Sequence, residues 1–309
     1  MIQRLIERFT RVSIVGVDAG SAMIKAAEVI RLDGQVFLRR AAVEKVGNEE
    51  PAALMRRLID ERGFTATHAA LGLASPEVIV QPFQFLRLPK KELTGAIRIE
   101  AEHAILNGHH PSATAMDWYL LDTGSSDSVR GLLAVVPKET LSEQTRVVRA
   151  AGLTPVIIDV KGLALWNAYW TLFGSRDPKP KTVLLINLGA HTTNLTIAKG
   201  ADELILVRDL QVGVMSPGGV HESEWTSELR DSLAYARSKS GLRTLEAAYV
   251  TGGGCSPELL PALRSALSVP VEIWNPLDHI AREEGSQAID PSLGPMLAVA
   301  IGLALRRFT

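Results

Sequence analysis

Two segments of this sequence place small and polar residues directly after an apolar run. The first reads VGVDAGSAMIK over residues 15–25, and the second reads LLINLGAHTTN over residues 184–194. An apolar run of this length predicts a buried strand, and small residues after it let backbone N–H groups approach an anion. Each segment is therefore a candidate phosphate-binding turn.

The first turn carries residue types that suit a metal-bound phosphate. Asp18 stands at the strand end, where a carboxylate can hold a hydrated Mg²⁺ ion through water. Gly20 and Ser21 offer N–H and hydroxyl donors, and Lys25 can reach back as a point charge. We predict that these four residues contact the phosphates of a nucleotide.

The second turn repeats the pattern with different polar groups. Asn187 lies near the end of the second apolar run. The residues predicted to contact phosphate after it are Gly189, Ala190, Thr192 and Thr193. Because the strand and turn unit occurs twice, the chain is expected to form two similar lobes that face a cleft.

A third segment, VTGGGC over residues 250–255, again runs from a predicted strand into a glycine turn. Gly252, Gly253 and Gly254 lack side chains, so adenine and ribose can lie against bare backbone there. A single turn of this kind is usually an ordinary hairpin. Three of them favour a nucleotide-binding fold over coincidence.

The composition fits a protein of the cytoplasm. The chain has 309 residues, of which 46% are hydrophobic and 22% charged, and its formal net charge of −1 gives no general attraction to nucleic acid. Cys255 is the single cysteine, which excludes an intramolecular disulfide. No uninterrupted apolar stretch is long enough to span a bilayer, and the N-terminus lacks a signal-peptide core.

The order of predicted elements indicates two α/β lobes and an inserted subdomain. The first lobe comprises residues 1–76, 156–180 and 295–309, the inserted α/β subdomain residues 77–155, and the second lobe residues 181–294. The N-terminal residues 1–9 put Ile2, Leu5, Ile6 and Phe9 on one helical face. That segment either packs on its own domain or docks on a membrane or partner, and the sequence leaves this open.

The three turns, in this order, resemble the phosphate-1, phosphate-2 and adenosine motifs of the actin, sugar kinase and Hsp70 superfamily. Four further segments, residues 88–93, 96–102, 151–160 and 189–196, resemble the PilM family, the FtsA-like cytoplasmic proteins of type IV pilus assembly. The likeness runs from about residue 12 to 305. It implies an actin-like, ribonuclease H-like duplicated fold with an FtsA-type inserted subdomain.

The resemblance also implies ATP and Mg²⁺ as cofactors and a PilN-like inner-membrane protein as partner. The partner's cytoplasmic N-terminal peptide would recruit the protein to the inner face of the cytoplasmic membrane. In this sequence the peptide groove between the first lobe and the inserted subdomain would draw on Leu86, Leu88, Ile97 and Glu100.

Two departures from the family pattern bear on ATP hydrolysis. Asn187 stands where the second phosphate turn usually carries an aspartate, and an amide is a weaker partner for hydrated Mg²⁺. The stretch around residues 209–230 is too short for the helical subdomain that related proteins carry there. Asp159 is the candidate to orient the attacking water, but an aspartate before Gly162 is as readily a helix cap. Retention of ATP and Mg²⁺ therefore stays open.

Two alternatives share this fold. One is an ATP-dependent phosphotransferase of the sugar or acetate kinase type, which requires a catalytic aspartate that the sequence does not identify. The other is an equivalent scaffold of a type II secretion or MSHA-type pilus machine, which differs only in its partner. The sequence also leaves open whether the protein is a monomer, a dimer or a ring.

Overall fold

The computed structural model describes residues 12–73, 75, 77–105, 111–121, 127–215, 222–239 and 241–309. The N-terminal segment 1–9, for which an amphipathic helix is considered above, lies outside the described residues. So does the part of the shortened insertion between residues 216 and 221. Within the described residues, no helix combines the length and apolarity needed to cross a bilayer.

The first lobe is built on a six-stranded sheet in the order β14-β3-β2-β1-β4-β8. Its strands are β1 (Val12–Ala19), β2 (Met23–Leu32), β3 (Gln35–Lys45), β4 (His68–Leu73), β8 (Thr154–Val160) and β14 (Ala281–Arg282). The first three strands form an antiparallel meander, while β1, β4 and β8 run parallel. Two helices, α2 (Pro51–Glu61) and α4 (Lys138–Ala150), contact each other and this lobe.

The second lobe repeats this plan with a five-stranded sheet in the order β11-β10-β9-β12-β13. Its strands are β9 (Thr182–Leu188), β10 (Thr193–Lys199), β11 (Glu203–Leu210), β12 (Ala247–Thr251) and β13 (Val271–Ile273). Again an antiparallel meander is followed by parallel strands. Its helices are α6 (Glu222–Lys239) and α7 (Leu260–Leu267). The predicted duplication is confirmed.

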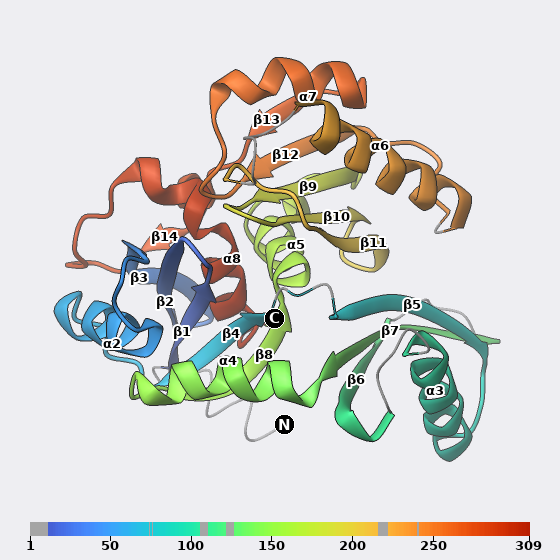
Figure 1. Cartoon of the computed structure of the whole chain (residues 1–309), viewed down its shortest axis with the longest axis horizontal. Helices are drawn as coiled ribbons and strands as arrows, with labels where there is room; N and C mark the ends of the chain where they lie inside the picture. The colour runs from blue at the N-terminus through green and yellow to red at the C-terminus, as the bar shows by residue number, and fades with distance from the viewer. Residues whose placement is uncertain are drawn as a thin grey trace.

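Two helices lie between the sheets, α5 (Lys161–Leu172) and α8 (Gly294–Leu305), as Figure 1 shows. They pack so closely that a Cβ on Gly302 of α8 would collide with the carbonyl of Ala164 in α5. A Cβ on Gly16 of β1 would likewise collide with the carbonyl of Ala300. The small residues of α8 therefore allow its close packing against α5 and β1.

The inserted subdomain is a separate antiparallel sheet with one helix packed on it. Strands β5 (Ile79–Leu86), β7 (Ser128–Pro137) and β6 (Thr114–Leu121) lie in that order, and α3 (Lys90–Ala104) covers one face. Figure 1 places this unit beside the end of the first-lobe sheet that carries β8. Contacts between β5 and β11 also connect it to the second lobe.

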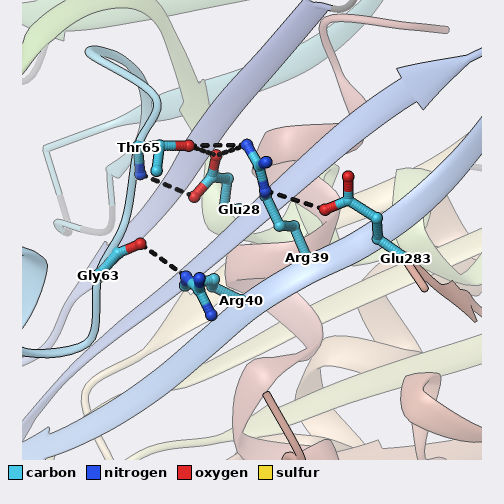
Figure 2. A network of polar contacts seen from close by, with 6 residues as sticks. All are labelled: Glu28, Arg39, Arg40, Gly63, Thr65 and Glu283. Carbon is cyan, nitrogen blue, oxygen red and sulfur yellow. Dashed lines mark hydrogen bonds and ion pairs between the residues drawn. The ribbon is translucent and has the colours of Figure 1, made fainter. Parts of the chain in front are cut away.

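A polar network fastens a late segment of the chain to the first sheet, as Figure 2 shows. The buried carboxylate of Glu28 accepts hydrogen bonds from the Thr65 backbone N–H and hydroxyl, at 3.0 and 2.8 Å. Arg39 sits at an irregularity in the pairing of β2 and β3, and its Nη1 lies 3.3 Å from Glu28 Oε1. Its Nε lies 2.9 Å from Glu283 Oε2, just after β14. The sequence did not predict that residues 281–283 join the first sheet.

Candidate functional site: the cleft between the lobes

The two phosphate-turn candidates have the same backbone geometry. Gly20 N–H donates to Met23 O at 3.0 Å, and Gly189 N–H donates to Thr192 O at 3.0 Å. Each bond closes a tight turn between antiparallel strands. The two glycine N–H groups are consequently engaged within their turns. The expectation that Gly20 offers its N–H to a phosphate therefore needs correction.

The third turn is attached to both lobes. Gly252 N–H donates to Pro295 O at the start of α8, and Gly254 N–H donates to Leu188 O, both at 2.9 Å. Gly252 has a φ of +98°, a conformation that glycine adopts without strain. A Cβ on Gly253 would lie 3.7 Å from Met23 Sδ, so this turn approaches the first phosphate turn across the cleft.

The first and second turns touch directly. Ser21 Oγ lies 2.9 Å from His191 Nδ1 in a hydrogen bond between exposed side chains that are distant in sequence. The fold thus brings the three predicted turns together between the two lobes, and we call this interlobe region the cleft.

Asp18 forms the charged centre of the cleft. It is the seventh residue of β1 and is almost fully buried. Its Oδ2 lies 2.9 Å from Lys25 Nζ, and its Oδ1 lies 2.8 Å from Lys161 Nζ. Lys161 Nζ also donates to the carbonyl of Ala19 at 3.4 Å. One carboxylate therefore holds two ammonium groups.

The ion pairs keep Asp18 charged. Burial by itself raises the pKa of this carboxyl, but the charges and hydrogen bonds of Lys161 and Lys25 outweigh it and lower the pKa well below its usual range. Asp18 is therefore an anion near neutral pH. The two lysines bring one more positive charge to the cleft than Asp18 neutralises.

Lys161 is the residue of this site that the sequence prediction missed. It is the first residue of α5, directly after β8. Because β1, β4 and β8 are parallel, their carboxyl ends reach the same edge of the sheet, where sites of α/β folds form. The position of Lys161 directly after a strand was the signal that the sequence offered. Only the observed strand order shows that this position lies beside Asp18.

The second turn has amides where the first has charges. Asn187 Nδ2 donates to Asn194 Oδ1 at 2.7 Å, and Asn194 Nδ2 donates to Asp209 Oδ1 at 2.6 Å. Burial raises the pKa of Asp209, opposed by its hydrogen bond with Asn194 and by the charge of Lys161. The Asn187 amide is thus committed to a hydrogen-bond chain within the second lobe.

Thr193 belongs to the core of the second lobe. Its hydroxyl is fully buried, donates to Val212 O at 2.7 Å, and lies 3.3 Å from Trp225 Nε1. This corrects the prediction that Thr193 contacts phosphate. Ala190 and Thr192 are partly exposed in the turn itself, and a Cβ on Gly213 would collide with the Ala190 carbonyl, so residue 213 packs closely against the turn.

The residues present do not fit a magnesium ion. Both oxygens of Asp18 face ammonium groups, and the Asn187 amide is engaged with Asn194. At an effective dielectric constant of about 20, one ammonium about 5 Å away repels a divalent cation by roughly 7 kcal/mol. The Asp18 carboxylate attracts it by a similar amount, so within this group of three charges the two ammonium groups prevail. Among the described residues, no cluster of three His, Cys, Asp or Glu side chains could hold a metal ion.

Asp159 does not contact the groups of the cleft described above. Its Oδ2 pairs with Arg306 Nε at 2.8 Å, beyond the end of α8, and its Oδ1 accepts the Val160 N–H at 2.8 Å. Both carboxylate oxygens are therefore engaged. The alternative prediction, a cap on α5, is not observed either, because Val160 occupies that position and makes no side-chain cap.

The predicted peptide-groove residues are divided between surface and core. Ile97 lies on the buried face of α3 and is fully buried, and Leu88 packs against the same core, so Ile97 cannot contact a peptide. Glu100 accepts a hydrogen bond from Gln81 Nε2 at 3.1 Å on the α3 face. Leu86, with 77% of its surface exposed, lies at the end of β5. Of the four predicted residues, Leu86 is therefore the apolar side chain that is exposed enough to contact a peptide.

Comparison with known proteins first establishes the class. The chain has the actin-like ATPase fold. It matches a Bacteroides thetaiotaomicron protein with actin-like ATPase fold and unknown function at 10% identity, with a TM-score of 0.51 over 92% of this chain and 96% of that one. It also matches the cytoplasmic domain of EpsL, an inner membrane component of the Vibrio cholerae type II secretion system, at 10% identity and TM-score 0.51, over 96% and 95%.

The family follows from two further findings. The family model for the type IV pilus assembly protein PilM matches residues 16–216. The solved PilM-PilN type IV pilus biogenesis complex contains a chain that superposes with a TM-score of 0.81 at 25% identity, over 97% of this chain and 100% of that one. This chain belongs to the PilM family of type IV pilus assembly proteins, as the sequence resemblance predicted.

Proposed function

We propose that this protein is a scaffold of a type IV pilus assembly machine that binds the cytoplasmic peptide of a PilN-type inner-membrane protein. The observation that carries the proposal is the full-length similarity to a chain of the PilM-PilN complex, at a TM-score of 0.81. The partner then holds the protein at the inner face of the cytoplasmic membrane. Co-fractionation with membranes that depends on the partner tests this part.

The free edge of β8 suits an extended peptide. Among the described strands, β8 is the last strand of its sheet and pairs only with β4. Unpaired N–H and C=O groups at such an edge can pair with an added strand. Val156 and Ile158 on β8 are apolar and exposed, which would provide side-chain contacts.

The inserted subdomain offers a matching apolar surface. Phe83 and Phe85 of β5 pack toward α3, so the alternate residue Leu86 points to the opposite face. Tyr119 of β6 is opposite Leu132 in the register, on that same face, and is 69% exposed. We therefore name Leu86, Tyr119, Val156 and Ile158 as the proposed peptide surface.

The proposed peptide surface can be tested by fluorescence anisotropy with a labelled peptide of the PilN-type partner. Ile158→Glu and Tyr119→Ala should each weaken binding about tenfold or more, which corresponds to roughly 1.4 kcal/mol. Ile99→Glu is the matched control, because Ile99 is also exposed, at 56%, but lies on α3. Equal loss in the control, or no loss in either variant, would remove this surface from the proposal.

We also propose that the cleft binds a nucleoside triphosphate. The convergence of the three turns supports this, through the Ser21–His191 contact and the approach of Gly253 to Met23. Anisotropy of a fluorescent ATP analogue should show binding that Lys25→Ala weakens. Lys138→Ala is the control, because the Lys138 ammonium donates to Ser112 O in the inserted subdomain. Asp159 has no role in this proposal, and the phosphotransferase alternative stays an untested prediction.

A further inference from the structure

The cleft contains an unusual arrangement of one buried anion between two cations. Lys25 comes from β2 and Lys161 from the start of α5, and each side chain keeps 12% of its surface exposed. The Lys25 ammonium would lie 3.4 Å from a Cβ on Gly20, so it stands at the first phosphate turn. Both cations therefore reach the place where the phosphates of a nucleotide are expected.

The Lys161 side chain is held in this position from several sides. Its Cγ would lie 3.1 Å from a Cβ on Gly72 of β4, so the stem packs tightly against this strand. Its ammonium contacts Asp18 Oδ1 and the carbonyl of Ala19. Holding a lysine through its stem and its head lowers the entropy that is lost when it binds a ligand.

The second lobe contributes amides and one carboxylate near these lysines. The Asn187 amide donates to Asn194, and Asn194 in turn donates to Asp209 Oδ1. Burial raises the pKa of Asp209, and the charge of Lys161 opposes this shift. Lys25, Lys161 and Asp18 are the charged groups of the cleft that are in direct ion-pair contact.

We propose that this cleft recognises phosphoryl groups directly through the ammonium groups of Lys25 and Lys161, without a divalent cation. This inference rests on the proposed nucleotide binding and specifies its chemistry. Ammonium groups bind phosphate oxygens by charge-assisted hydrogen bonds. Asp18 is a positioning residue that holds both ammonium groups and does not bind a metal. The ligand is the free polyphosphate anion, and Mg²⁺ competes with the two lysines for it.

The decisive experiment is calorimetric titration of the full chain with ATP in excess EDTA and in excess MgCl₂, at equal ionic strength. Binding that is equal or tighter in EDTA is expected, and inorganic triphosphate should behave in the same way. Binding that requires MgCl₂ would overturn this inference while leaving nucleotide binding intact. Absence of binding in both buffers would overturn nucleotide binding itself, and this inference with it.

A variant series tests which lysine acts. Lys161→Gln should raise the Kd for ATP in EDTA about tenfold or more, as for the loss of one charge-assisted hydrogen bond. Lys161→Arg should retain most of the affinity, and Lys138→Gln should leave it unchanged. Unchanged affinity in Lys161→Gln would overturn the assignment of Lys161. Should that variant fail to fold, the comparison of EDTA with MgCl₂ on the wild type still decides.

Asn187→Asp provides the complementary test. It adds one carboxylate at the second turn. Binding of ATP in EDTA should weaken in this variant, since the new anion repels phosphate. An unchanged Kd in EDTA would show that the phosphates do not come near the second turn, and would contradict a site that lies between both turns.

Discussion

The two phosphate turns share a backbone and differ in charge. In both, a glycine N–H donates at 3.0 Å to the carbonyl three residues later, between the strands of an antiparallel pair. At the end of β1 stands a buried carboxylate with two lysines, whereas near the end of β9 stands an amide joined to a second amide. Turn geometry is thus independent of the charge beside it.

This difference has a thermodynamic consequence. A buried charge is tolerated only with its partners, so Asp18 and its lysines stabilise the fold as a unit. A buried amide needs only its hydrogen bonds, and Asn187 has one in Asn194. The first turn is therefore the more fragile of the two to loss of a single polar group.

Replacement of Asp18 by alanine should have the largest effect. It leaves two partly buried ammonium groups without their carboxylate and should lower the free energy of unfolding by about 3–5 kcal/mol. Asn187→Ala should cost less, about 1–3 kcal/mol, for an unsatisfied amide. Urea unfolding followed by circular dichroism measures both. Asp117→Ala, at an exposed aspartate, is the control. Equal losses of unfolding free energy at positions 18 and 187 would contradict the difference between the two turns.

Alanine substitutions at Gly20 and Gly189 test whether the two turns share one backbone geometry. A Cβ on Gly20 would lie 2.9 Å from Met23 O, and one on Gly189 would lie 2.8 Å from Thr192 O. Both variants should therefore lose a similar amount of stability, about 1–3 kcal/mol. Gly95→Ala in α3 has open space and should gain about 1 kcal/mol. A loss confined to one turn would show that the two backbones are not equivalent.

The two acids should respond to pH in opposite directions. The pKa of Asp209 is raised, so the folded state keeps a proton that the unfolded state loses above about pH 4. Stability therefore falls as pH rises through that window, and Asp209→Asn should raise the urea midpoint at about pH 7. The gain should vanish toward about pH 4.

The pH dependence of stability that Asp18 causes should have the opposite sign, and the urea midpoint measures it as well. Its pKa is lowered, so its contribution is present above about pH 4 and is lost as pH falls through the folded pKa. Asp18→Asn should therefore destabilise the protein at about pH 7 and differ less from the wild type in strong acid. The same sign of change at positions 18 and 209 would contradict the charge assignment of the cleft.

The contact between the turns should give the smallest effect. Ser21 and His191 are exposed, so Ser21→Ala and His191→Ala should each change stability by no more than about 1 kcal/mol. A double-mutant cycle should give a coupling of roughly 0.5–1 kcal/mol, since the residues share one hydrogen bond. Zero coupling would mean that the two turns are not joined in solution.

Local patterns predicted the elements well. The bounds of α2, residues 51–61, follow from local signals, because proline stands at its first position and its apolar residues recur at helical spacing. The strands around Asp18 and Asn187 were predicted from continuous apolar runs. Residues 281–283 were missed as part of the first sheet, since a two-residue strand has no periodicity to detect.

The sequence by itself determined the duplicated turns and the family, because both depend on residues that are contiguous in the chain. Only the tertiary structure placed Lys161 beside Asp18, Thr193 in the core of the second lobe and Ile97 in the core of the inserted subdomain. Those outcomes depend on strand order and on which face of a sheet a helix covers. Alternation along a strand fixes two faces, and long-range packing decides which of them becomes the site.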